Sequence, residues 1–206
     1  MIETWRKDWG QGDFPFYWVQ IADYLNESPV PSEVSLFAEI RESQTLTLNK
    51  LPNLGQAVII DLGEGRDIHP RNKKDVASRL ARIALARDYG FKIPYKNPSY
   101  ASMEIGEGFI VLDFNDIGEQ LYSFDSNELK GFTLCGEDGV FANAQAGIIN
   151  GSKIKVWVEG INDPVAVRYA WASNPICNIY SQTGSTLLPL TPFRTDRFPL
   201  KSEKLD

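Results

Sequence analysis

The first half of the chain alternates between strand and helix patterns, and this alternation constrains the fold more than any other feature of the sequence. Residues 14–22, FPFYWVQIA, form an aromatic and β-branched run that is typical of a buried strand. The apolar centre of residues 56–62, QAVIIDL, predicts another strand, covered on both faces. Amphipathic segments at 3.6-residue spacing follow these runs, over 33–48 and 73–89. This order predicts parallel strands joined by crossovers, so we expect residues 1–98 to be α/β.

Single residues predict the ends and the faces of the two expected helices. Ser32, which follows two prolines, is the expected N-cap of the first helix, and Gly90 is the expected stop of the second. In the second helix Val76, Leu80, Ile83 and Ala84 are expected to face inward. Arg79, with the other arginines of that helix, is expected to face outward.

The pattern changes after Pro94 and Pro98, where short alternating runs are separated by Gly, Asn and Asp turns. The runs are GFIVLDF, LKGFTLCG, GVFANAQAGII, SKIKVWVEG and DPVAVRYAW. This spacing predicts an antiparallel, β-sandwich-like region over residues 99–206, ending in an irregular tail rich in Pro and Ser/Thr. We therefore expect a domain boundary near residue 98, with an α/β part over 1–98 and an all-β part over 99–206.

Charge and composition disfavour several classes of partner. The chain has 21 Lys and Arg against 27 Asp and Glu, a net charge of -6, so it offers little attraction to nucleic acid or to an anionic membrane. No run approaches the ~20 apolar residues of a membrane helix, and the first residues lack the apolar core of a signal peptide. We expect a soluble chain with no nucleic-acid and no membrane partner.

The cysteines and the single histidine give little support for a metal site. One histidine without a Cys-x-x-Cys pair argues against structural zinc. Cys135 and Cys177 are expected to be reduced core thiols, with a disulfide as the alternative.

The loop after the second expected strand carries the only histidine, His69. Ligands of open α/β sheets bind beyond the carboxyl ends of the strands, where this loop falls. An imidazole suits proton transfer near neutral pH, and Asp67 lies two residues earlier, on the same side of an extended backbone. Asp67 and His69 are thus candidate catalytic residues; the alternative is an ordinary loop with a solvated turn carboxylate.

Other motifs in the chain are weaker candidates for chemistry. No Gly-x-Ser-x-Gly elbow supplies a nucleophile. Gly63 and Gly65 lack both the third glycine of a dinucleotide loop and the Lys-Ser/Thr of a P-loop, so they are expected to be ordinary turn glycines. An aromatic cluster could stack on a sugar but is expected to be core; its members are Trp9, Phe14, Phe16, Tyr17 and Trp18.

Several segments together resemble one family. They are WRKDWGQGDFPFYWVQIA, LPNLGQAVIIDLGEGRDIHPRNKKDVASRLARIALARDYG, VAVRYAWASNPICNIYSQTG and PFRTD. In this order they resemble the C-terminal half of the sialate O-acetylesterases, a branch of the SGNH hydrolases, over nearly the whole chain. GQGDFPFYWVQ and DIHPRNK are the most specific parts. The resemblance implies the C-terminal part of an SGNH-type, flavodoxin-like parallel-sheet domain, followed by a closing β region.

The resemblance also implies an activity. It implies a serine esterase that removes O-acetyl groups from sialic acids or related sugars without metal or cofactor, with His69 as the catalytic base. The family's serine segment lies before the point where this sequence begins. The expected partners are thus an O-acetylated sugar and the missing N-terminal half, or a complementing chain, and we expect the isolated chain to be inactive. The alternative is a non-catalytic sugar-binding or structural β module.

Two further points follow from the resemblance. The wider SGNH pattern has its Asp three residues before the His, where this chain has Arg66, so the group that orients His69 stays open between Asp67, a backbone carbonyl and Glu64. If earlier strands of the sheet are missing, residues 14–22 present a free edge, which favours self-association. The sugar and the compartment stay open, although the resemblance is compatible with a periplasmic or secreted parent.

Overall fold

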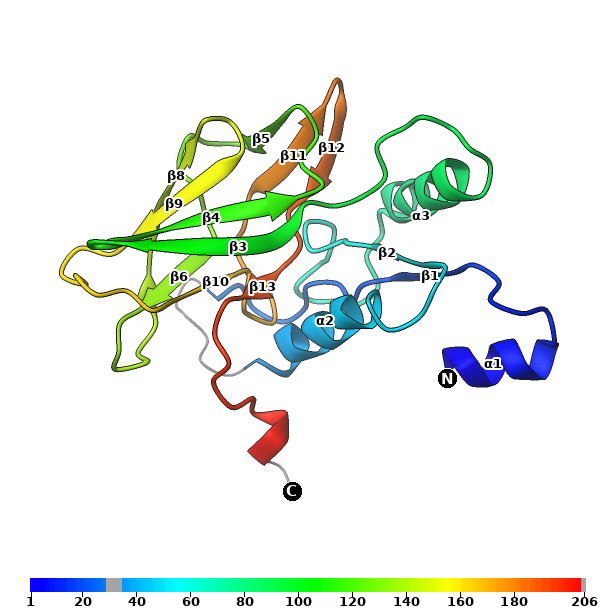
Figure 1. Cartoon of the computed structure of the whole chain (residues 1–206), viewed down its shortest axis with the longest axis horizontal. Helices are drawn as coiled ribbons and strands as arrows, with labels where there is room; N and C mark the ends of the chain where they lie inside the picture. Colours follow the sequence, from blue (N-terminus) through cyan, green and yellow to red (C-terminus); the bar gives the residue numbers. More distant parts are fainter. Residues whose placement is uncertain (29–34, 205–206) are drawn as a thin grey trace.

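The computed structural model describes residues 1–28 and 35–204. Its first half contains three helices and a pair of parallel strands (Figure 1). The elements are α1 (Ile2–Trp9), β1 (Phe16–Val19), α2 (Leu36–Thr47), β2 (Leu54–Ala57) and α3 (Lys73–Arg87). β1 and β2 run parallel, with Phe16 opposite Leu54 and Val19 opposite Ala57. The α/β class is confirmed. β1 lies within the expected strand over 14–22, but β2 overlaps the expected strand over 56–62 only at Gln56 and Ala57.

Three antiparallel sheets make up the second half. One has the order β3 (Ser99–Gly106), β4 (Phe109–Asn115), β9 (Lys153–Trp157), β8 (Gln145–Ile149). Another has the order β13 (Phe193–Arg194), β10 (Ala166–Tyr169), β6 (Phe132–Cys135), β7 (Ala142–Asn143). The smallest has the order β12 (Thr186–Pro189), β11 (Ile179–Thr183), β5 (Gln120–Ser123). A 3-10 turn, Ser202–Lys204, follows them.

The irregular tail expected from the sequence is wrong, because β11 and β12 form a hairpin within it. Gly184, with φ +54°, lies in the two-residue turn that joins the strands. Ile179 and Tyr180 are adjacent in β11, and Leu187 and Leu188 are adjacent in β12, so these strands lack the apolar–polar alternation from which a strand is predicted. The boundary at residue 98 stays a prediction.

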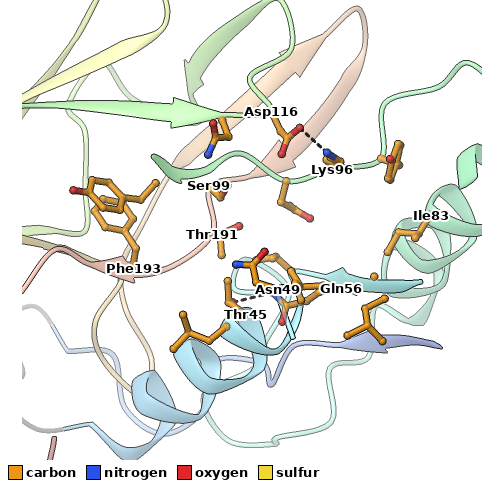
Figure 2. A pocket seen from close by; sticks show the side chains of 18 of the residues that line it. Thr45, Asn49, Gln56, Ile83, Lys96, Ser99, Asp116, Thr191 and Phe193 are labelled. Atoms are coloured by element: carbon orange, nitrogen blue, oxygen red, sulfur yellow. Dashed lines mark hydrogen bonds and ion pairs between the residues drawn. The ribbon is translucent and has the colours of Figure 1, made fainter. Parts of the chain in front are cut away.

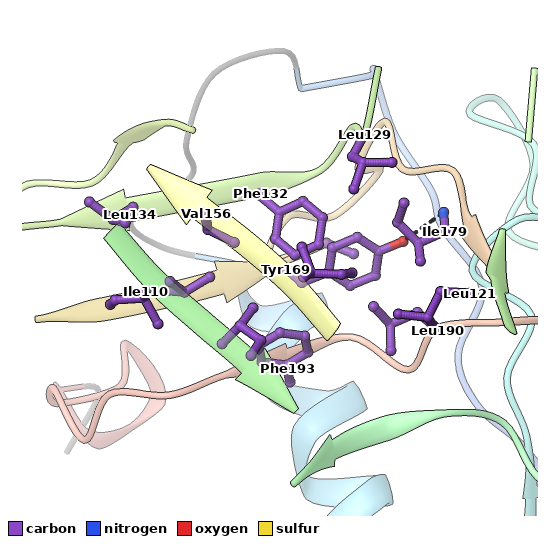
Figure 3. Close-up of a cluster of buried hydrophobic side chains, with 14 of the residues drawn as sticks. Ile110, Leu121, Leu129, Phe132, Leu134, Val156, Tyr169, Ile179, Leu190 and Phe193 are labelled. Carbon is purple, nitrogen blue, oxygen red and sulfur yellow. Dashed lines mark hydrogen bonds between the residues drawn. The ribbon is translucent and has the colours of Figure 1, made fainter. Parts of the chain in front are cut away.

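The core lies between the antiparallel sheets and centres on Tyr169 (Figure 3). Its ring centroid lies 4.7 Å from that of Phe132 and 5.9 Å from that of Phe193, and its hydroxyl accepts the Ile179 N–H at 3.2 Å. Residues 54–60 are all buried, which confirms the expected two-sided cover of this segment. Val58 joins the core of the antiparallel region, so the chain leading to His69 is packed against that region.

The aromatic cluster is not core, contrary to expectation. Trp9 is 69% exposed, and the other four aromatic residues are half-buried. Within the described residues β1 has β2 as its one sheet partner, so one edge of the strand is left without a neighbour. An aromatic run alone does not distinguish a central strand from such an edge strand.

The N-cap of α2 also differs from the expected one. Ser32 lies outside the described residues, and the N-cap is Ser35, whose hydroxyl accepts the N–H of Ala38 at 3.2 Å. Gly90 lies just beyond α3 in the left-handed conformation, with φ +74°, as expected of a residue that ends a helix.

The described helices include none that is long and apolar enough to span a bilayer. Cys135 and Cys177 are free thiols, as expected. Burial raises the pKa of Cys135 to about 11 and that of Cys177 to about 12. Both thiols therefore stay protonated near neutral pH and are poor nucleophiles.

Candidate functional site

The loop that carries His69 is fixed at both ends. At its start both oxygens of Asp61 accept hydrogen bonds from the Arg79 guanidinium at 2.6 Å, and Tyr180 donates its hydroxyl at 3.0 Å. At its end the Asn72 side chain accepts the Asp75 N–H at 3.2 Å and caps α3. The loop over residues 62–71 therefore connects two well-anchored points.

The expected outward orientation of Arg79 is wrong. The side chains of Arg79 and Asp61 are each only 11% exposed. Arg79 also donates to the Val58 carbonyl at 2.7 Å. The reason is that Asp61, which follows β2, lies against the inner face of α3, where the Arg79 guanidinium can form a bidentate pair with it.

Asp67 and His69 lie in direct contact. One carboxylate oxygen, Oδ1 of Asp67, accepts the backbone N–H of His69 at 2.9 Å. The same oxygen lies 3.2 Å from Nδ1 of the imidazole. The two residues predicted from the sequence are therefore in contact. They are joined by a turn in which the aspartate side chain accepts the backbone N–H of the residue two positions later.

This contact defines what the ring can do chemically. The carboxylate of Asp67, an acceptor 3.2 Å from Nδ1, favours the tautomer that carries its proton on Nδ1. In this tautomer Nε2 has a free lone pair that can accept another proton. The backbone N–H of His69 and then its side chain lower the pKa of Asp67, so the carboxylate is charged at neutral pH. A charged partner stabilises the imidazolium that forms when Nε2 is protonated.

Glu64 is not the partner of the ring. Its Oε1 accepts the Arg71 N–H at 2.7 Å, and its Oε2 lies 3.4 Å from Nε of Arg71. Its carbonyl accepts the Asp67 N–H at 2.9 Å, which closes the turn before His69. Of the groups left open by the sequence, Asp67 is the one within hydrogen-bonding distance of the imidazole.

The pair lies open to solvent on this chain. The side chain of His69 is 82% exposed, and that of Asp67 is 54% exposed. Such a ring can exchange protons freely but has few neighbours to hold a substrate. Enclosure of a ligand at Nε2 therefore requires a second surface opposite the loop.

A groove of about 1000 Å³ is lined by residues that include neither Asp67 nor His69 (Figure 2). It runs between α2, β2, α3, the chain over residues 95–100 and β13. Some of its polar groups pair with one another: Gln56 donates to Thr45 at 3.0 Å, and Lys96 pairs with Asp116 at 3.1 Å. The groove offers amides, hydroxyls and aromatic rings, which suit binding of a polar, hydroxyl-rich ligand better than an acid–base reaction.

The described residues contain no group of three or more His, Cys, Asp and Glu side chains that could hold a metal ion.

The sequence missed one residue that holds the loop. Asp23 is 9% exposed, and its Oδ1 accepts the Gly63 N–H at 2.7 Å. Gly63 and Gly65 are not ordinary turn glycines, since a Cβ on either would lie closer than 3.0 Å to residues 23–25. The sequence did hold a clue to this contact. A carboxylate follows the first expected strand, a Gly-x-Gly segment follows the second, and the carboxyl ends of parallel strands meet at one edge of a sheet.

Comparison with known proteins gives a consistent result. No protein-family model matches the chain. A sialate O-acetylesterase of Mus musculus is 31% identical over 221 residues, covering 94% of this chain and 39% of the mouse protein. The Homo sapiens sialate O-acetylesterase is 28% identical over 217 residues, covering 94% of this chain and 40% of the human protein. The chain thus spans about two fifths of the length of these curated relatives.

A solved structure is similar over nearly the whole chain. The crystal structure of a carbohydrate acetylesterase from Xanthomonas citri matches with a TM-score of 0.85 and 39% identity. The match covers 96% of this chain and 45% of that one.

Proposed function

Because the chain is a homologue of the sialate O-acetylesterases over 94% of its length, we propose that it supplies the acid–base part of a carbohydrate O-acetylesterase. The observation that carries the proposal is the 3.2 Å contact between Oδ1 of Asp67 and Nδ1 of His69, in the loop after β2. The parallel pairing of β1 and β2 supports the further proposal that this loop lies at the carboxyl edge of an SGNH-type sheet. The coverage of 39–40% of the relatives is consistent with a C-terminal half.

The proposed substrate is an O-acetylated sialic acid or a related sugar. Nε2 of His69 accepts the hydroxyl proton as a serine oxygen attacks the acetyl carbonyl, and the imidazolium returns that proton to the departing sugar hydroxyl. Water then attacks the acetyl-serine with the same base, releasing acetate and the free serine. Asp67 holds Nδ1–H throughout. We propose that the serine comes from the N-terminal half of the parent protein or from a complementing chain, because the His69 loop of this chain is open to solvent.

The test is an esterase assay of the parent protein with p-nitrophenyl acetate. His69→Ala should lower the rate by at least ~10² because the general base is lost. Asp163→Asn, in an exposed turn of the β region, is the matched control and should keep the wild-type rate. Full activity in His69→Ala would remove the proposed role of this residue. The chain alone should hydrolyse little ester.

A second candidate function rests on the groove of about 1000 Å³. Its hydroxyl and amide lining supports a non-catalytic module that binds a sugar without hydrolysing it. Titration of the chain with free sialic acid, followed by amide chemical shifts, tests this alternative. Saturable shifts at Thr45 and Gln56 would favour it, and unchanged shifts would reject it.

A further inference from the structure

The segment after β1 contacts the His69 loop at two successive points. Oδ1 of Asp23 accepts the Gly63 N–H at 2.7 Å, and the Leu25 N–H donates to the Gly65 carbonyl at 3.1 Å. A Cβ on Gly63 would lie 2.0 Å from Oδ1 of Asp23, and a Cβ on Gly65 would lie 2.6 Å from the Leu25 carbonyl oxygen. The two segments are therefore in contact so close that only glycine fits.

Leu25 is held in an unfavourable backbone conformation at this contact. Its φ is +79°, a left-handed conformation that bulky residues rarely adopt. Its N–H is used by Gly65, and its carbonyl accepts Nδ2 of Asn174 at 2.7 Å. The hydrogen bonds of its N–H and of its carbonyl hold Leu25 in this strained conformation.

The same segment is anchored to the antiparallel region by Arg41. The guanidinium of this fully buried residue donates to the carbonyls of Ile21 and Ala22 at 3.1 and 2.8 Å. It also donates to those of Ala172 and Ser173 at 2.6 and 2.8 Å. A chain of contacts thus runs from the β10–β11 connection, through residues 21–25, to the loop that carries Asp67 and His69.

We propose that Asp23 is a positioning residue for His69: by holding Gly63 it fixes the loop in the conformation in which Asp67 meets the imidazole. The importance of this for catalysis rests on the proposed function. The positioning itself is a property of this chain. Asp23 would act through the loop and not on the substrate.

The single histidine of the chain makes the proposal directly measurable. In the ¹⁵N-labelled chain, ring nitrogen shifts report which nitrogen carries the proton. The wild type should favour Nδ1–H, and Asp67→Ala, which lacks the partner, should lose that preference. Asp23→Ala should move the ring shifts toward those of Asp67→Ala. Asp23→Asn, whose amide oxygen can still accept the Gly63 N–H, should stay close to the wild type.

A second variant covers the case in which Asp23→Ala fails to fold. Gly63→Ala places a methyl group against Asp23 and should displace the loop with the same effect on the ring. Gly147→Ala is its control, because a Cβ there meets nothing nearer than 4.0 Å. Wild-type ring shifts in folded Asp23→Ala, or in folded Gly63→Ala, would overturn the proposal.

Activity separates this proposal from the function it rests on. In the parent enzyme Asp23→Ala should lower kcat on the order of 10²-fold, as expected for a misplaced catalytic group, with little change in KM. If His69→Ala keeps full esterase activity while Asp23→Ala still alters the ring shifts, the proposed function fails and the positioning role stands. If His69→Ala is inactive while the ring shifts of Asp23→Ala are unchanged, the positioning role fails alone.

Discussion

At the scale of single residues, the candidate site depends on one oxygen atom. Oδ1 of Asp67 accepts the backbone N–H of His69 and also faces its ring. The backbone turn and the orientation of the imidazole are therefore set by the same group. Because both partners belong to His69, loss of the carboxylate charge affects the loop conformation and the acid–base chemistry together.

The first prediction concerns acid pH. The backbone N–H of His69 lowers the pKa of Asp67, so the carboxylate of the folded chain should titrate below the ordinary aspartate value of 3.8. The stabilisation of the turn is then present above that value and is lost as pH falls through the lowered pKa. A titration of the Asp67 carboxyl carbon and the His69 amide by NMR measures this midpoint. A midpoint at or above the ordinary value would contradict the assignment.

Residues differ in how far the sequence could predict their roles. Asp67 and His69 could be paired because their contact spans two residues of one loop. Arg79 and Asp23 could not, since their partners lie 18 and 40 residues away. Their roles depend on which helix face and which strand end the fold brings together.

At the scale of elements, Arg41 of α2 joins three parts of the chain. Its guanidinium is fully buried and donates to four carbonyls, two after β1 and two in the β10–β11 connection. Burial lowers its pKa to about 10, so it stays charged at neutral pH. Burying the charged guanidinium costs desolvation free energy. Removing it also destabilises the fold, because the carbonyls then lose a hydrogen-bond donor.

The second prediction follows from this arrangement. Arg41→Met should lower the free energy of unfolding by about 3 kcal/mol, because four carbonyls lose the guanidinium donor, two of them in buried hydrogen bonds. Urea denaturation measures the change. Arg197→Met, an exposed arginine in the C-terminal segment, is the control and should cost less than about 0.5 kcal/mol. Equal stability of the two variants would contradict the role of Arg41.

The elements that the sequence predicted best are those with a continuous apolar pattern. The helix expected over 73–89 is observed over 73–87, and the apolar centre of the segment expected over 56–62 is buried, although the strand itself lies over 54–57. β3 was missed because residues such as Ser102 and Glu104 are exposed along it, so that it lacks a clear alternation. β11 and β12 were missed because their apolar residues are adjacent, Ile179 with Tyr180 and Leu187 with Leu188, and do not alternate with the polar ones.

At the scale of the whole molecule, the parallel pair β1–β2 is small for a sheet. Within the described residues it has two strands, and β1 has β2 as its sole partner. The exposed Trp5 and Trp9 of α1 lie near it, with the Trp5 ring centroid 5.6 Å from that of Phe16. A free parallel edge beside exposed aromatic rings is a surface on which another strand or another copy of the chain can pack.

The third prediction is that the isolated chain self-associates. Size-exclusion chromatography with light scattering, over a concentration series, should give a mass above the 23.2 kDa of one chain. Trp9→Ser should reduce the association, whereas Tyr89→Ser, which removes a comparably exposed ring beyond α3, should not. A monomer at every concentration would contradict the prediction.

The central claim is that Asp67 and His69 act as one acid–base unit in sugar deacetylation. The most direct test is a double-mutant cycle on acetate release from O-acetylated sialic acid by the parent protein, with Asp67→Asn, His69→Ala and the double variant. Groups that act as a unit are strongly non-additive, so the double variant should be no slower than His69→Ala alone, which itself should lose at least ~10² in rate. Independent, multiplying losses from the two substitutions would contradict the claim.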